Sequence, residues 1–136
     1  MLTEEKIREL VALAAEAREK AYVPYSHYPV GAAVLFASGK IYTGCNVENA
    51  SYGLTNCGER TAIFKGVSEG EREILAVAIS VKGQEAGSPC GACRQVIREF
   101  GPKAVVISAA ENGNYFTKTL EELLPHSFGP EYLAGS

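Results

Sequence analysis

Apolar residues recur at helical spacing in the first 20 residues of the chain. Thr3 can cap a helix there, and the acidic Glu4 and Glu5 suit the positive end of the helix dipole. We therefore expect a helix that ends near Lys20. Its apolar face consists of Ile7, Leu10, Val11 and Ala14.

Beyond this helix, short apolar runs alternate with turn signals. The expected strands are 30–36, a second strand that starts at Ile41, 74–81, 104–108 and 115–118. Ser38-Gly39 and Asn112-Gly113 are the turn signals of two hairpins. Three further helices are expected at 57–70, 89–100 and 119–123. Strand, helix and strand in succession predict a right-handed parallel crossover, and hence an α/β fold: a three-layer α/β/α sandwich with a mixed five-stranded sheet.

Length and composition limit the class of protein. With 136 residues, 46% of them hydrophobic, the chain fits one domain, 1–136, with a loose C-terminal tail at 131–136. A net charge of −3 without a lysine or arginine cluster argues against a nucleic-acid partner. The first 20 residues are too charged for a signal peptide, and no apolar run approaches the roughly 18 residues that span a bilayer. We expect a cytoplasmic protein, without a membrane partner, that acts on a small neutral molecule.

Three of the four cysteines lie in two short segments, around residues 57 and 90. Ser88 as N-cap and Pro89 at the first helical position would place Cys90 and Cys93 on one face of a helix. Together with Cys57 they offer three thiol ligands. A catalytic zinc site takes three ligands from the protein and leaves the fourth position to water, so we expect one zinc ion per chain.

Two other classes of protein use cysteines in this way. A structural zinc module would have a closed site, with Cys45 or a histidine as the fourth ligand. A thiol redox protein would use Cys90 and Cys93 without a metal. Cys45 has no cysteine or histidine near it and follows a strand, so we expect a small buried core residue. His27 lies in a polar loop and is expected to be solvent-exposed.

Glu59 follows Cys57 by two residues, and on a helix such positions point to different sides. We therefore expect its carboxylate beside the water rather than among the ligands, as a general acid and base. The alternative is a capping box, in which Asn56 caps the helix and Glu59 returns a hydrogen bond. The order Cys-x-Glu followed downstream by Pro-Cys-x-x-Cys is the signature of zinc deaminases.

Three residues ahead of this signature have the chemistry of a binding site. Asn46 and Glu48 would share a face if the second strand continued, and their polar groups suit the paired hydroxyls of a sugar. An exposed loop end is the alternative for both. Tyr28, in the loop before the first strand, is either a half-buried aromatic at the core edge or a residue that stacks on a base.

From about Tyr22 to about Phe128 the chain resembles the small nucleoside-type cytidine deaminases. The resemblance rests on the zinc signature and on Pro24-Tyr25-Ser26, Val30-Gly31-Ala32-Ala33, Gly44-Cys45-Asn46-Val47-Glu48-Asn49 and Glu122-Leu123-Leu124-Pro125. It implies a cytidine deaminase-like fold and the zinc-dependent hydrolysis of cytidine and deoxycytidine to uridine and deoxyuridine, with release of ammonia, in pyrimidine salvage. A deaminase of cytosine-containing antibiotics is a close alternative, and the Asn46 and Glu48 pair favours nucleosides.

The resemblance also implies roles for individual residues. Tyr28 would stack on the pyrimidine, and the Gly58 backbone NH would bind the pyrimidine carbonyl oxygen. Arg60 would donate hydrogen bonds to the zinc thiolates and offset their charge; a surface ion pair is the alternative. Phe128 would enter the site of a neighbouring subunit, which implies a homotetramer with shared active sites.

Overall fold

The computed structural model describes residues 2–133, and a five-stranded sheet of order β2-β1-β3-β4-β5 lies at its centre. The strands are β1 (Val30–Phe36), β2 (Ile41–Cys45), β3 (Ile74–Val81), β4 (Val105–Ala109) and β5 (Tyr115–Thr119). β3 and β4 are parallel, and every other neighbouring pair is antiparallel. The predicted mixed sheet is confirmed, as are the two hairpins and the parallel crossover.

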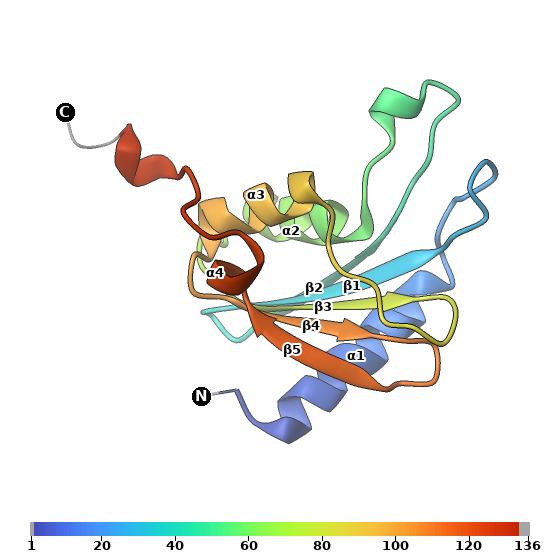
Figure 1. Ribbon diagram of the computed structural model, residues 1–136, viewed down its shortest axis with the longest axis horizontal. Coiled ribbons are helices and arrows are strands. Elements are labelled where there is room, and N and C mark those ends of the chain that lie inside the picture. Colours follow the sequence, from blue (N-terminus) through green and yellow to red (C-terminus); the bar gives the residue numbers. More distant parts are fainter. Residues whose placement is uncertain (1, 134–136) are drawn as a thin grey trace.

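Helices cover both faces of the sheet and complete the predicted three layers (Figure 1). α1 (Glu4–Arg18) packs on one face. α2 (Gly58–Ser68), α3 (Gly91–Phe100) and the one-turn α4 (Leu120–Leu123) lie on the other. Thr3 caps α1 as expected, because its side chain accepts a hydrogen bond from the Lys6 NH. None of the helices within residues 2–133 is both long and apolar enough to cross a membrane.

The two faces of the sheet carry residues of different size. Toward α1, the central strands present small side chains, Ala33, Ala76 and Ala78, which let the helix approach closely. Gly31 shows how close this approach is: a Cβ there would lie 2.0 Å from the Ala14 carbonyl oxygen. Toward α2 and α3 the strands present larger apolar side chains, Val34, Phe36, Val77, Ile79 and Val106. The core on this second face therefore fixes the two helices whose first residues carry the cysteines.

The starts of α2 and α3 differ from the expectation. Both helices begin one to two residues later than predicted, with Cys57 and Cys90 as N-cap residues. Ser88 does not cap α3; its hydroxyl instead accepts a hydrogen bond from Arg94. Pro89 lies outside the helix and is buried. α1 ends at Arg18 rather than Lys20, and β4 is shifted by one residue.

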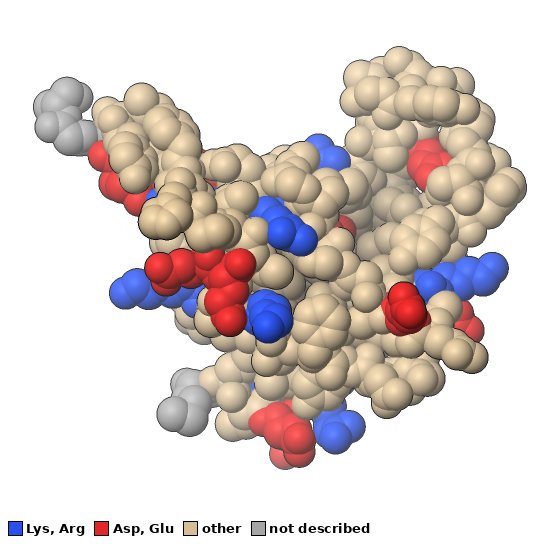
Figure 2. All heavy atoms as spheres, in the orientation of Figure 1, with Lys and Arg blue, Asp and Glu red and all other residues tan. Residues whose placement is uncertain are grey.

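Two segments project from these layers on the side of α2 and α3 (Figure 1). One is 46–57, with the short turn η1 (Tyr52–Leu54), and the other is 124–133, with η2 (Pro130–Tyr132). Figure 2 shows a hollow between them, and on this face acidic and basic side chains are interspersed. The exposed large apolar side chains of the two segments are Val47, Tyr52, Leu54, Phe128, Tyr132 and Leu133. Of the tail expected to be loose, residues 131–133 lie in or next to η2, and 134–136 lie outside the described residues.

Candidate functional site

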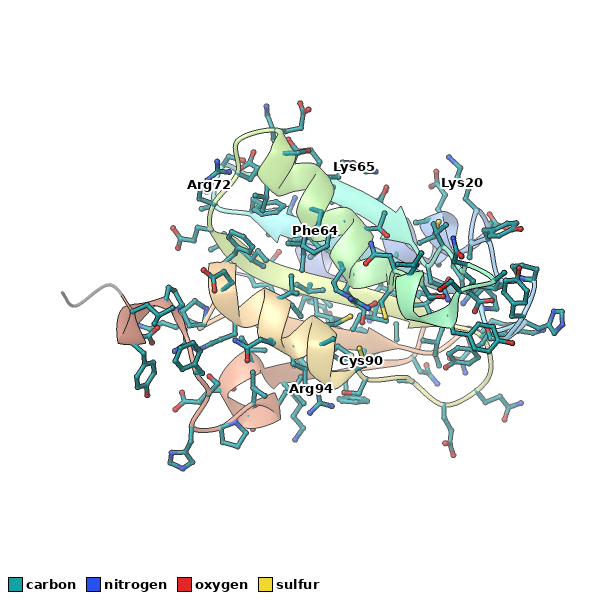
Figure 3. The ribbon with its side chains drawn as sticks, turned by 90° about the horizontal axis from the view of Figure 1, so that it is seen from above. Lys20, Phe64, Lys65, Arg72, Cys90 and Arg94 are labelled. Atoms are coloured by element: carbon teal, nitrogen blue, oxygen red, sulfur yellow. The ribbon has the colours of Figure 1, made fainter. Side chains whose placement is uncertain are left out.

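Three sulfur atoms meet where α2 and α3 begin. Cys57 caps α2, Cys90 caps α3, and Cys93 lies in the first turn of α3. The Cys57 and Cys90 sulfurs are 3.9 Å apart, and the Cys90 and Cys93 sulfurs are 3.5 Å apart. All three lie within 4.8 Å of one another. α2 and α3 run side by side, and Cys90 lies at the N-terminal end of α3 (Figure 3).

These distances fit one metal ion. Zinc bonds of about 2.3 Å to tetrahedral sulfur ligands place those ligands about 3.8 Å from one another. Cys45 does not belong to the group; it is half-buried at the end of the edge strand β2, and so is less buried than predicted. Three thiols without a fourth argue against a closed four-cysteine site. A redox pair of Cys90 and Cys93 would leave the position of Cys57 unexplained.

The starts of the two helices favour negative charge at the sulfurs. Neither Cys57 nor Cys90 receives a side-chain capping hydrogen bond, so the first NH groups of both helices are not capped by these side chains. Such NH groups, together with the helix dipole, lower the pKa of a thiol at a helix start. Two helices converge here, and their positive ends act on the same three sulfurs.

Arg60 adds a full positive charge to this environment. Its Nη2 atom donates to the Cys57 sulfur over 3.1 Å, while its Nε is buried without a partner among the described residues. A hydrogen bond from the Cys93 thiol, followed by the Arg60 guanidinium, lowers the pKa of Cys57 to about 5. The same bond to Cys57, together with burial, raises the pKa of Cys93. Zinc binds thiols in their deprotonated form, so metal binding must displace the protons that these thiols carry.

Glu59 is buried beside the sulfurs. Its side chain is 4% exposed, and this burial raises the pKa of its carboxyl group. The capping-box alternative does not hold, because Cys57 is the N-cap and Glu59 is therefore the second helical residue, one position short of the third. The amide of Asn56 donates instead to the Thr61 hydroxyl. A carboxyl group with a raised pKa in this position is suited to accept and return protons.

Asn46 and Glu48 do not form the free pair that the sequence suggested. The buried Asn46 accepts from the Val30 NH at 2.9 Å and donates to the Tyr28 carbonyl at 3.0 Å. Glu48 accepts from the NH groups of Tyr25 and Ser26, each at 3.1 Å, and from the Ser26 hydroxyl. Both side chains therefore hold the loop ahead of β1.

Glu48 nevertheless remains available to a ligand. It lines an open hollow of about 340 Å³ together with Tyr25, Ser26, Tyr52 and Thr55. The Ser26 hydroxyl holds the pKa of Glu48 below its ordinary value, so the carboxylate stays charged near neutral pH. Tyr25 and Ser26 appeared in the sequence analysis only within the Pro24-Tyr25-Ser26 motif, and their place in this hollow was not predicted.

The two candidate aromatic residues lie on separate segments. Tyr28 is 45% exposed in the loop before β1, near Gly87. Phe128 is 56% exposed and stacks on Tyr132, with ring centroids 5.4 Å apart. The Phe128 carbonyl accepts a hydrogen bond from the Gln95 side chain, in the middle of α3, and the flanking Ser127 and Glu131 bind Arg98. The segment thus packs along the central and C-terminal part of α3, whereas the sulfurs lie at the start of that helix. His27 is exposed, as expected.

Comparison with known proteins places this site in a family. The model of the cytidine and deoxycytidylate deaminase zinc-binding region matches residues 4–109, which include all three clustered cysteines. The cytidine deaminase of Sporosarcina psychrophila is 48% identical over 94% of this chain and 95% of its own length. That of Halalkalibacterium halodurans is 48% identical over 90% of this chain and 93% of its own length.

Solved structures show the same likeness. The crystal structure of cytidine deaminase from Burkholderia pseudomallei superposes with a TM-score of 0.86 at 44% identity, covering 93% of this chain and 99% of that one. The enzyme from Mycobacterium tuberculosis gives a TM-score of 0.77 at 40% identity, covering 89% and 95%. The predicted fold class is thereby confirmed.

We expect metal analysis of the purified protein to find about one zinc per chain. Replacing Cys57, Cys90 or Cys93 by serine should remove it, because two remaining thiolates hold zinc poorly. Cys45→Ala is the matched control and should keep its zinc. Zinc loss from a folded Cys45→Ala protein would instead indicate a closed four-cysteine site, and a metal-free wild type would favour the redox pair.

Proposed function

This chain belongs to the family of cytidine and deoxycytidylate deaminases with a shared zinc-binding region, and we propose that it hydrolyses cytidine and deoxycytidine to uridine and deoxyuridine, with release of ammonia. The observation that carries this proposal is the cluster of three thiols beside a buried carboxyl group. Pyrimidine salvage is the general role of the family. A cytoplasmic location and a single domain over residues 1–136 stay predictions.

Cys57, Cys90 and Cys93 are the residues that would hold the one zinc ion. When bound, zinc supplies Lewis acidity that brings the pKa of a water molecule to about 7. Three thiolates weaken that effect, because their negative charges exceed the two positive charges of the metal. Arg60 and the two helix starts offset this excess: Arg60 through its bond to the Cys57 sulfur, and the helices through their uncapped NH groups.

Glu59 performs the proton transfers in this proposal. It accepts the proton of the attacking water and passes it to the ring nitrogen beside the reacting carbon. It then takes the second proton from the oxygen that has been added to the ring carbon and gives it to the departing amine, so the C–N bond breaks, ammonia leaves and the carbonyl group of uridine forms. The burial of Glu59 supports this role, since a carboxyl group with a raised pKa exchanges protons near neutral pH more readily than an exposed one.

The nucleoside would be bound by residues from the loops around the site. Gly58 is the first residue of α2, so its NH has no acceptor within the helix and is free for the pyrimidine carbonyl oxygen. Tyr28 would stack on the ring. Glu48 would accept from the ribose hydroxyls, and Asn46 would contribute its one remaining amide hydrogen while it anchors Tyr28.

A homotetramer with shared active sites completes the proposal. Phe128 is exposed on a segment that packs beside the central and C-terminal part of α3 rather than beside the sulfurs, so its ring is better placed to reach a neighbouring subunit. Exposed aromatic side chains are enriched where subunits meet. Tyr52 and Phe64 are also exposed on this side of the molecule, as is Tyr132. An isolated chain would leave this apolar surface in water.

Replacing Glu59 by glutamine should leave zinc in place and lower turnover of cytidine by about 10²- to 10⁴-fold, because an amide cannot carry protons. Loss of cytidine absorbance measures the rate, and metal analysis of the same sample supplies the control. Near-normal turnover by a Glu59→Gln protein that retains its zinc would show that Glu59 does not transfer protons in the reaction.

Cytidine and deoxycytidine should react far better than free cytosine, by about 10⁴-fold in kcat/KM, since a site that binds hydroxyls disfavours a substrate without them. Glu48→Ala should narrow this gap mainly by harming the nucleosides. Glu85→Ala, at an exposed carboxylate that makes no hydrogen bond among the described residues, is the matched control. If the wild-type enzyme had the same kcat/KM for cytosine as for the nucleosides, Glu48 would not contribute to recognition of the sugar.

The purified protein should sediment as a tetramer, and Phe128→Ala should raise KM for cytidine by about tenfold, because an aromatic contact with a base is worth about 1 to 3 kcal/mol. Phe116→Ala removes another exposed phenylalanine ring, from β5, and serves as the control. A fully active monomer would refute the shared site.

A further inference from the structure

The two halves of the metal site are held in different ways. The segment before Cys57 is fixed by main-chain bonds: Val47 and Asn56 exchange two hydrogen bonds of 3.0 Å. Thr61 adds its hydroxyl and its NH, both of which donate to the Cys57 carbonyl. The first half-site is thus anchored to a neighbouring extended segment and to its own helix.

The segment before Cys90 has no such anchoring. Within the described chain, residues 84–89 make no main-chain to main-chain hydrogen bond. Their two hydrogen bonds both come from a single side chain, that of Arg94: its Nε donates to the Pro89 carbonyl at 2.7 Å, and its Nη2 donates to the Ser88 hydroxyl at 2.9 Å. Besides the packing of the buried Pro89 and of Gly87 against Val81, the hydrogen bonds of this arginine are what hold the chain that leads into Cys90.

Arg94 also connects this segment to a third part of the molecule. Its Nη1 donates to the Leu123 carbonyl, at the end of α4, over 2.8 Å. The guanidinium therefore spans the loop before Cys90, its own helix α3 and the end of α4. No carboxylate of residues 2–133 lies within 4.0 Å of the Arg94 guanidinium, so its hydrogen bonds go to neutral carbonyl and hydroxyl groups. Figure 3 shows Arg94 and Cys90 at the same end of α3.

We propose that Arg94 is a positioning residue for the metal centre. Its three hydrogen bonds hold the Ser88-Pro89 segment in place, so that the Cys90 sulfur stays close enough to the Cys57 and Cys93 sulfurs for all three to bind one metal ion. Partners of this kind, one step removed from the ligands, typically change metal affinity or activity by about 10- to 100-fold when they are lost. Cys90 is the exposed member of the three, and in the described chain residues 84–89 ahead of it form no other hydrogen bond. The inference rests on the proposed function, because it takes the three cysteines as zinc ligands.

The planar fork of arginine is essential to this arrangement. Three donors in fixed directions reach three acceptors, and the single ammonium group of lysine cannot span them. Arg94→Lys keeps the positive charge and loses the fork, whereas Arg94→Met removes both. Arg98 lies one turn further along α3, and its side-chain hydrogen bonds within residues 2–133 go only to Ser127 and Glu131 of the C-terminal segment. Arg98→Met is therefore the matched control, since it removes an equally long, hydrogen-bonded arginine from the same helix.

The test measures the rate at which zinc passes from the purified protein to a chromogenic chelator, at a temperature where circular dichroism shows every variant folded. We expect Arg94→Met and Arg94→Lys to release zinc about 10- to 100-fold faster than wild type, and Arg98→Met to stay within about twofold. If Arg94→Met does not fold, Ser88→Ala carries the test, because it deletes one acceptor at an exposed position. It should accelerate release by about fivefold.

Three results would overturn the proposal. Release at the wild-type rate from Arg94→Met, or from Ser88→Ala where that variant carries the test, would show that the segment is held by packing alone. Equally fast zinc release from Arg98→Met would show that Arg94 acts only by stabilising the helix in general. Zinc release from Arg94→Lys at the wild-type rate would show that the charge of Arg94 matters rather than its geometry. Failure of the proposed function is distinguishable, because the wild-type protein would then hold no zinc.

Discussion

Three thiol groups held within 4.8 Å of one another are the constraint on which this structure depends. As thiolates they repel one another, so the arrangement needs positive charge around it and a cation within it. The first turns of α2 and α3 and the side chain of Arg60 provide the surrounding charge. The sheet sets the two helices side by side on one face, where larger apolar residues lock their positions. Packing far from the sulfurs thus fixes the distances between them.

The same packing explains why a carboxyl group can lie buried at this point. Glu59 is carried by the first turn of α2, so its position follows from that of Cys57. Burial raises its pKa, and the neighbouring Cys57 acts in the same direction. In the proposed mechanism this buried carboxyl group carries the protons. One helix start thus brings it together with Cys57, one of the three residues that would hold the zinc ion.

Much of this was predictable from the sequence, because it depends on local patterns. Apolar runs and turn residues such as Ser38-Gly39 predicted the strands and hairpins, and the spacing of Cys57, Cys90 and Cys93 predicted that the three thiols lie together. The start of α3 was misjudged because the Ser88 hydroxyl, a good helix cap by type, is bound by Arg94. That contact depends on the path of the loop before the helix. No local rule predicts it.

The loop ahead of β1 shows the same limit. Asn46 and Glu48 were read as free polar groups, but their partners lie 16 to 23 residues earlier in the chain, at Val30, Tyr28, Ser26 and Tyr25. Hydrogen bonds across such separations are set by the tertiary fold. Phe128 is a further case: its ring stacks on Tyr132 yet stays exposed, and the role proposed for it depends on a second chain.

X-ray absorption at the zinc edge of the purified wild-type protein tests the central claim most directly, because it counts the ligands of the metal by element and distance. An open three-thiolate centre predicts three sulfur atoms at about 2.3 Å and one oxygen or nitrogen atom at about 2.0 to 2.2 Å. Four sulfur atoms, or fewer than three, would contradict it.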